Sequence, residues 1–220
     1  MEDQNDSGES SIPKIAVMAF SIFFNIINHS LIGFVAIYMT LLAISGDPIP
    51  LTWHAWSCSI GYQVLMLEGL MMFYSENVWS AQLDRSTKQC VHWILQVVGS
   101  LLALSGILVK YICHNGEHFQ SKHSIIGILS AACLMISLGS GIFALKAFQL
   151  RNVFRPALVK TFHYFVGITS ISLGLVALFF GYDKKFMIAR SDEYIRFYLQ
   201  VIAITTAILS LLGAIQSLYR

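Results

Sequence analysis

Charged residues are scarce in this chain of 220 residues. Only 12% of its side chains are Asp, Glu, Lys or Arg, whereas 56% are apolar and the mean hydropathy is +0.66. Soluble domains carry about 25% charged residues, so this composition excludes an ordinary soluble protein. The net charge of +2 is small, and we expect no nucleic-acid partner.

Cysteine is scarce as well, and its four copies lie far apart. Cys58, Cys90, Cys113 and Cys133 form no short-spaced pair, so neither a disulfide framework nor a zinc module is indicated. The motif Cys-x-x-Cys-His, which attaches haem covalently, is absent. Any haem in this protein is therefore predicted to be held by coordination and packing alone.

Long apolar runs make up most of the sequence. The hydrocarbon core of a bilayer is about 30 Å thick, which about 20 helical residues cross at ~1.5 Å each. Six runs are long enough: Ala16–Ile44, Ala55–Tyr74, Val91–Tyr111, Ser124–Phe148, Tyr164–Tyr182 and Tyr194–Leu218. Runs of this length favour helices over the shorter alternating strands of a barrel. The sequence predicts an all-α polytopic membrane protein with six transmembrane helices.

The two ends of the chain lead to further expectations. Residues 1–11 are polar and acidic, which predicts a disordered cytoplasmic tail, and residues 12–220 form one transmembrane domain. Because the start is acidic and the first apolar run is long, we expect a retained helix rather than a cleaved signal peptide. If the N-terminus is cytoplasmic, more basic residues fall on the cytoplasmic side than outside, which weakly favours this orientation and a cytoplasmic C-terminus. The inner residues are Lys14, Arg85, Lys88, Lys146, Arg151, Arg155, Lys160 and Arg220. The outer residues are Lys110, Lys122, Lys184, Lys185, Arg190 and Arg196.

Each of the four middle runs opens with a histidine, namely His54, His92, His123 and His163. Consecutive membrane helices alternate in direction, so the second and fourth start at one face and the third and fifth start at the other. This alternation predicts that His54 lies beside His123, and that His92 lies beside His163 at the opposite face.

These histidines are candidate metal ligands. Ionisable groups within membrane helices are costly and usually functional, and neutral imidazole is a common ligand of iron, copper and zinc. Glycines follow the histidines at helical spacing and are predicted to clear space for a flat porphyrin: Gly61, Gly99, Gly106, Gly127, Gly167, Gly174 and Gly181. The alternative is that small residues simply let membrane helices pack closely. Two histidines per iron leave no open axial position, which favours electron transfer over oxygen activation.

Five stretches, four of which contain these histidines, resemble the cytochrome b-561 family of transmembrane electron-transfer proteins. The resemblance extends from the first helix to the sixth. Its stretches are Trp53-His54, Leu67-Glu68-Gly69-Leu70, Cys90-Val91-His92-Trp93-Ile94-Leu95-Gln96, Ser121-Lys122-His123-Ser124 and Lys160-Thr161-Phe162-His163.

The resemblance implies a six-helix fold in which helices two to five form a haem-binding core that holds two non-covalent b-type haems. His92 and His163 would ligate the cytoplasmic haem, and His54 and His123 the lumenal or outer one. It implies an oxidoreductase that passes electrons from cytoplasmic ascorbate to monodehydroascorbate or ferric chelates across the membrane. It also implies a homodimer with cytoplasmic termini, and, for a form without appended domains, endoplasmic reticulum or vesicle membranes.

Basic residues near the inner histidines suggest a site for ascorbate, which is an anion. Lys88 lies four residues before His92, Lys160 lies three before His163, and Arg155 shares their face. The alternative is that these are ordinary positive-inside charges. Ascorbate-using members of the family carry arginines at the inner end of the second helix, whereas Gly69 to Glu76 contains none.

On the outer side, Lys122 adjoins His123 and His118 lies close by in sequence, so we expect both to dock the anionic acceptor. His29 and Glu68 are expected to form hydrogen bonds between helices or near the haem propionates rather than to ligate iron. Two other functions stay open: a proton channel or transporter in which buried histidines and Glu68 relay protons, and a haem subunit of a larger redox complex without activity of its own.

Overall fold

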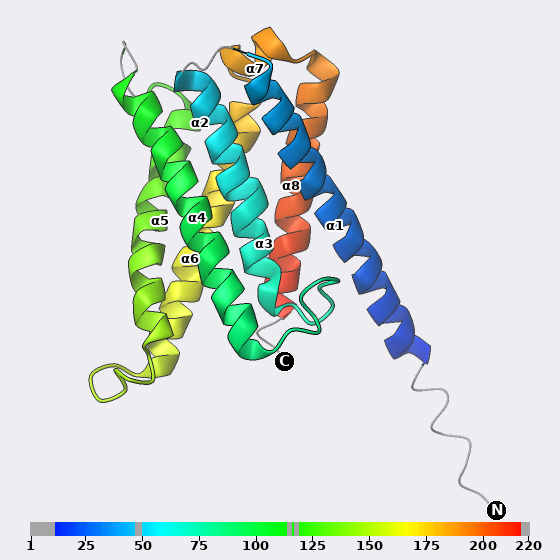
Figure 1. Cartoon of the computed structure of the whole chain (residues 1–220), viewed down its shortest axis with the longest axis vertical. Coiled ribbons are helices and arrows are strands. Elements are labelled where there is room, and N and C mark those ends of the chain that lie inside the picture. Colours follow the sequence, from blue (N-terminus) through cyan, green and yellow to red (C-terminus); the bar gives the residue numbers. More distant parts are fainter. Residues whose placement is uncertain (1–11, 47–49, 114–115, 117–118, 217–220) are drawn as a thin grey trace, which may run out of the picture.

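The computed structural model describes residues 12–46, 50–113, 116 and 119–216, and the regular elements of this part are helices. Five of them are long and apolar enough to cross a bilayer: α1 (Ile12–Ile44), α4 (Arg85–Ile112), α5 (Lys122–Leu145), α6 (Pro156–Gly181) and α8 (Glu193–Gln216). Figure 1 shows them as one bundle, with the N-terminal half of α1 leaning away from the other helices. The chain is therefore an all-α polytopic membrane protein, as predicted.

The second predicted helix is present as a continuous helical segment whose winding changes along its length. It consists of α2 (Pro50–Cys58), the π-helix η1 (Ser59–Met66), α3 (Leu67–Leu70) and the 3₁₀-helix η2 (Met71–Phe73). We call it the second segment; it lies between α4 and α1 (Figure 1). A π-helix of two turns is rare, and nothing in the sequence indicated it.

Several helices begin before the apolar run that predicted them, because polar residues cap them. The Asp84 carboxylate accepts a hydrogen bond from the Thr87 amide at 2.9 Å, which starts α4 at Arg85. The hydrogen bonds from Thr87 also lower the pKa of Asp84. Ser121 and Ser124 form a capping box before α5, and Pro156 is the first residue of α6.

This extension corrects the expected position of the histidines. His92 is the eighth residue of α4 and His163 is the eighth residue of α6, so neither opens its helix. At ~1.5 Å per residue, both lie about 10 Å inside the helix. His123 is the second residue of α5 and His54 is the fifth of α2, close to the expected helix starts.

The charged stretch between the fifth and sixth predicted runs contains a short helix, α7 (Lys185–Arg190). Its Phe186 and Met187 are 8% and 2% exposed, so this apolar pair anchors α7 to the end of the bundle. The fourth predicted run ended at Phe148, but α5 ends at Leu145 and turns follow.

Three of the seven glycines that were predicted to clear space for a porphyrin instead allow helices to touch. A Cβ on Gly99 would lie 3.0 Å from the carbonyl oxygen of Gly61, so the backbones of α4 and η1 are in contact there. A Cβ on Gly174 would overlap the ring of Tyr62, which packs on α6. Close helix packing, the alternative stated above, therefore explains Gly61, Gly99 and Gly174.

Candidate haem sites

The four histidines form two pairs at opposite ends of the bundle. The rings of His54 (α2) and His123 (α5) have centroids 5.9 Å apart and planes at 83°. The rings of His92 (α4) and His163 (α6) have centroids 6.4 Å apart and planes at 89°. These neighbours are the ones that the alternation of helices predicted. We call the two ends of the molecule the His54 end, beside α7 in Figure 1, and the His92 end.

A backbone carbonyl fixes each histidine ring. The Nδ1 atom of His54 lies 3.0 Å from the Gly106 oxygen, and that of His92 lies 2.7 Å from the Gly69 oxygen. At the other member of each pair, the distances are 2.8 Å from His123 Nδ1 to the Ala177 oxygen and 3.2 Å from His163 Nδ1 to the Ser137 oxygen. Because a carbonyl only accepts, Nδ1 carries the proton in all four rings. Nε2 then keeps the lone pair that binds a metal.

This donor set fits a haem iron better than a bare metal ion. Among the described residues, no three His, Cys, Asp or Glu side chains are grouped so that they could hold an ion. Two imidazoles that bind one ion at about 2 Å, the value known for zinc, hold their nitrogens about 4 Å apart. The centroid separations of 5.9 and 6.4 Å accommodate such a spacing, since each centroid lies behind its nitrogen. Haem supplies the remaining ligands from its own ring.

Two glycines lie directly against the histidine rings. A Cβ on Gly181 would lie 3.1 Å from Cε1 of His123, and a Cβ on Gly141 would lie 3.1 Å from Cε1 of His163. Gly181 was among the glycines predicted to clear the face. Gly141 was missed because it belongs to α5 while its histidine belongs to α6, and sequence spacing along one helix does not reveal neighbours on another.

The basic residues expected near the inner pair lie at the His92 end. Lys88 is half-buried, and its Nζ donates to the Ala81 carbonyl oxygen at 3.4 Å. Arg155 and Lys160 are exposed at the start of α6. At the His54 end, Lys122 is exposed and lies 5.9 Å from the centre of the Phe180 ring. His118 lies outside the described residues.

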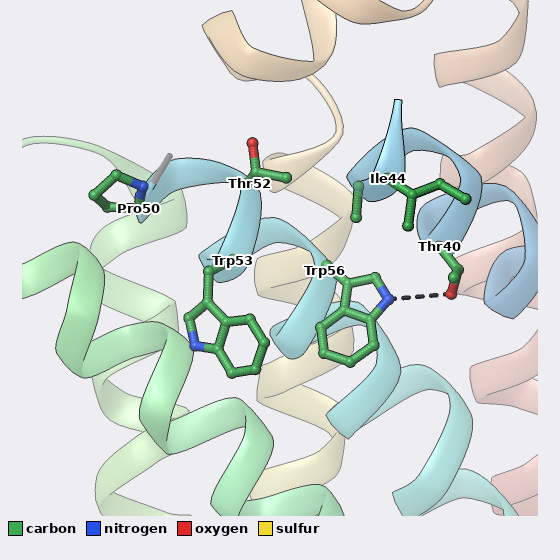
Figure 2. A pocket seen from close by; sticks show the side chains of 7 residues that line it. Thr40, Ile44, Pro50, Thr52, Trp53 and Trp56 are labelled. Carbon is green, nitrogen blue, oxygen red and sulfur yellow. Dashed lines mark hydrogen bonds between the residues drawn. The ribbon is translucent and has the colours of Figure 1, made fainter. Parts of the chain in front are cut away.

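An apolar pocket of about 450 Å³ opens between α1 and α2 at the His54 end (Figure 2). Trp53 and Trp56 line it with their rings 5.3 Å apart, and the Trp56 indole donates to Thr40 Oγ1 at 3.1 Å. None of its seven lining residues is charged, so this pocket suits an apolar molecule and not an anionic acceptor.

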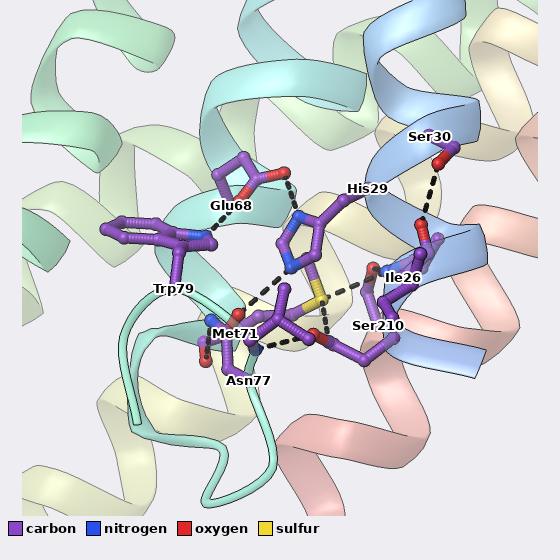
Figure 3. A network of polar contacts seen from close by, with 11 residues as sticks. Ile26, His29, Ser30, Glu68, Met71, Asn77, Trp79 and Ser210 are labelled. Carbon is purple, nitrogen blue, oxygen red and sulfur yellow. Dashed lines mark hydrogen bonds and ion pairs between the residues drawn. The ribbon is translucent and has the colours of Figure 1, made fainter. Parts of the chain in front are cut away.

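A polar network joins α1 to the second segment near the His92 end (Figure 3). His29 Nδ1 lies 2.7 Å from Glu68 Oε1, and His29 Nε2 lies 2.9 Å from Asn77 Oδ1. The Trp79 indole donates to the second Glu68 oxygen at 3.0 Å. His29 and Glu68 thus bond to each other across helices, as predicted, and Asn25 and Asn28 beside them are 5% and 1% exposed.

The proton between His29 and Glu68 can be placed by elimination. The Asn77 amide nitrogen donates to the Met71 carbonyl at 3.0 Å, so its oxygen faces His29 and must accept from Nε2–H. The remaining contact, between Nδ1 and the Glu68 carboxyl group, then holds one shared proton.

Removing either partner of this contact is expected to destabilise the protein. Glu68→Ala or His29→Ala leaves a largely buried polar group without its partner, which costs about 1–3 kcal/mol. We expect each variant to unfold at a lower temperature in detergent, and the double variant to lose much less than the sum of the two. Strictly additive losses would show that the pair does not stabilise the bundle.

Three comparisons place the chain among known proteins. The family described as "Eukaryotic cytochrome b561" matches residues 53–189, which is more than half of the chain and includes all four histidines. A mouse (Mus musculus) protein named "Transmembrane reductase CYB561D2" is 31% identical over 162 residues, covering 68% of this chain and 70% of its own. The human (Homo sapiens) protein of the same name is 28% identical over 160 residues with the same coverage.

The family match and the site agree in the residues that they involve. The matched range begins one residue before His54 and ends eight residues after Gly181, so it contains both histidine pairs, most of α2 and the whole of α4, α5 and α6. A b-type haem is therefore the cofactor of this fold. The chain belongs to the eukaryotic cytochrome b561 family.

Proposed function

We propose that each histidine pair holds one non-covalent haem b, and that the protein passes electrons across the membrane from ascorbate at the His92 end to monodehydroascorbate or a ferric chelate at the His54 end. The observation that carries the proposal is the placement of two histidine pairs at opposite ends of one bundle. Membership of the cytochrome b561 family and the reductase name of the relatives support an electron-transfer function.

Each residue of the proposed sites has a defined task. Haem, when bound, supplies an iron that gains and loses one electron. Backbone carbonyls orient the four rings and make each Nε2 a stronger electron-pair donor to a metal. These carbonyls belong to Gly69, Ser137, Gly106 and Ala177. If each pair holds an iron, the two histidines would leave it no open position for a substrate, so substrates would exchange electrons at the edge of each site.

At the His92 end, Lys88, Arg155 and Lys160 are proposed to attract and position the ascorbate anion. At the His54 end, Lys122 and His118 are proposed to dock the anionic acceptor. A transmembrane reductase needs docking sites of this kind at both ends, because its two substrates never meet.

Neutralising the donor site is expected to weaken binding more than turnover. In Lys88→Ala and Lys160→Ala, we expect KM for ascorbate to rise about two- to fivefold with little change in kcat, because exposed ion pairs are worth about 0.2–1 kcal/mol. The difference from the unaltered protein should shrink at high salt. Lys14→Ala is the matched control, since Lys14 is an exposed lysine on α1. An unchanged KM in both variants would place the donor elsewhere.

The remaining features of the proposal concern the whole protein. Residues 12–220 are proposed to form one transmembrane domain with both termini in the cytoplasm, as a homodimer in endoplasmic reticulum or vesicle membranes. The expected tail, residues 1–11, lies outside the described part of the chain.

Purified protein in lipid vesicles tests this function. Ascorbate is enclosed in the vesicles, a membrane-impermeant ferric chelate is added outside, and ferrous product is measured with and without protein. We expect product only when both protein and enclosed ascorbate are present. If protein that binds haem gives no more product than empty vesicles, it does not transfer electrons across the membrane by itself, which would favour a haem subunit of a larger complex.

A further inference from the structure

The four histidines do not have equivalent hydrogen bonds. His92 and His123 each donate to a single carbonyl at a short distance, 2.7 and 2.8 Å. His163 has a longer bond of 3.2 Å to the Ser137 oxygen, and its Nδ1 also lies 3.3 Å from the Ser140 hydroxyl. The His163 proton is therefore shared between two distant acceptors.

Ser140 weakens the His163 bond in a second way. Its hydroxyl donates to the Ser137 carbonyl at 3.0 Å, so one carbonyl oxygen receives both the serine O–H and the histidine N–H. Two donors on one oxygen each form a weaker bond than one donor alone. Ser140 is 8% exposed, and its neighbour Gly141 lies against the ring of His163, so this geometry is fixed by packing.

The His54 end contains a related side chain with a different effect. Cys58 Sγ lies 3.7 Å from His54 Nδ1, but it bonds to the Ala103 carbonyl and not to the Gly106 carbonyl that accepts from His54. The thiol therefore does not compete for the ligand's own acceptor. The Gly69 carbonyl that accepts from His92 also receives a backbone amide, that of Met71. Among the four rings, the described residues place a side-chain donor on the ligand's acceptor only at His163.

A strong bond from Nδ1–H to its acceptor makes the opposite nitrogen more basic, and a more basic ligand favours ferric over ferrous iron. We propose that Ser140 is a positioning residue that keeps the His163 bond weak and thereby raises the reduction potential of the His92–His163 site. This inference rests on the proposed function, in which His163 ligates the haem that accepts the donor's electron. A higher potential there favours one-electron transfer from the donor to the ferric iron, which becomes ferrous.

A purely structural role for Ser140 is the rival explanation. Serines in membrane helices often bond to a carbonyl three or four residues earlier, as Ser140 does to Ser137. Ser105 forms the same bond, to the Leu102 carbonyl at 2.8 Å in α4. It adjoins Gly106, whose carbonyl accepts from His54 at the other end of the bundle, so Ser105→Ala is a matched control for the His92–His163 site.

The test is a redox titration of the holoprotein followed by visible absorption. It is made for Ser140→Ala, Ser140→Thr and Ser105→Ala, each also in a His123→Leu background that leaves only the His92–His163 site. For Ser140→Ala we expect the reduction potential of that site to fall. At a given applied potential, the ratio of ferrous to ferric iron should be about two- to tenfold smaller, which corresponds to the free energy of one hydrogen bond. A tenfold change corresponds to 59 mV for one electron. Ser140→Thr keeps the hydroxyl and should restore the original value.

Two outcomes would overturn the inference: a potential that does not move in Ser140→Ala, or one that moves equally in Ser105→Ala. A shift to higher potential would also contradict it. Failure of the proposed function looks different, because the unaltered protein would then contain no haem that depends on His92 and His163. The spectrum of the unaltered protein therefore separates the two failures before any variant is compared.

Discussion

Replacing His163 with leucine is expected to remove one haem and leave the other. The variant should hold about one haem per chain in place of two, because the iron loses one of only two protein ligands. His92→Leu should give the same spectrum, and the haem that stays bound should have the same reduction potential, since both changes abolish the same site. Transmembrane electron transfer should stop in both variants. Haem content by the pyridine assay and a redox titration measure these effects.

Double variants turn this result into a test of the pairing. His92→Leu with His163→Leu should retain one haem, no less than either single variant. His54→Leu with His163→Leu should retain none, because it takes one ligand from each pair. A chain that kept haem after the second combination, or lost all of it after the first, would contradict the arrangement that the ring contacts indicate.

Enlarging the glycines that touch the histidine rings should also empty one site at a time. Gly181→Val is expected to displace the ring of His123 and remove the haem of the His54 end. Gly141→Val is expected to displace the ring of His163 and remove the haem of the His92 end. In both cases the first added carbon already lies 3.1 Å from the imidazole, and the branched side chain extends further. Haem content and the potential of the remaining site report the loss.

Gly139→Val provides the control for these substitutions. Gly139 lies on α5 two residues before Gly141, and nothing lies within 4 Å of a Cβ built there. Gly139→Val and Gly141→Val each place a β-branched residue in α5, so they alter helix propensity equally. Full haem content in Gly141→Val would mean that the ring of His163 does not need the space that this glycine provides.

The pairing of the histidines was predictable from the sequence because it depends only on helix alternation. Four runs of membrane length, each with a histidine near its start, leave one way to bring the histidines together across the bundle. The depth of the rings was not predictable in the same way. Asp84 and Pro156 start α4 and α6 among polar residues, which places His92 and His163 two turns inside their helices.

Contacts between helices were the part that sequence spacing could not supply. Glycines counted along one helix were predicted to face that helix's own histidine. In the structure, Gly99 touches the second segment and Gly181 touches the histidine of α5. Ser140 and Gly141 shape the surroundings of His163 from a neighbouring helix, and no periodic pattern marks them. Pairings of this kind depend on helix rotation, which the hydrophobic pattern of a membrane helix defines poorly.

The number of haems per chain, measured together with the visible spectrum before and after ascorbate, shows whether the histidine pairs are haem ligands. We predict two low-spin b-type haems per chain, of which ascorbate reduces at least the one held by His92 and His163. Well-folded protein that contains no haem would contradict this prediction, because the two histidine pairs would then serve neither as ligands nor as an electron path.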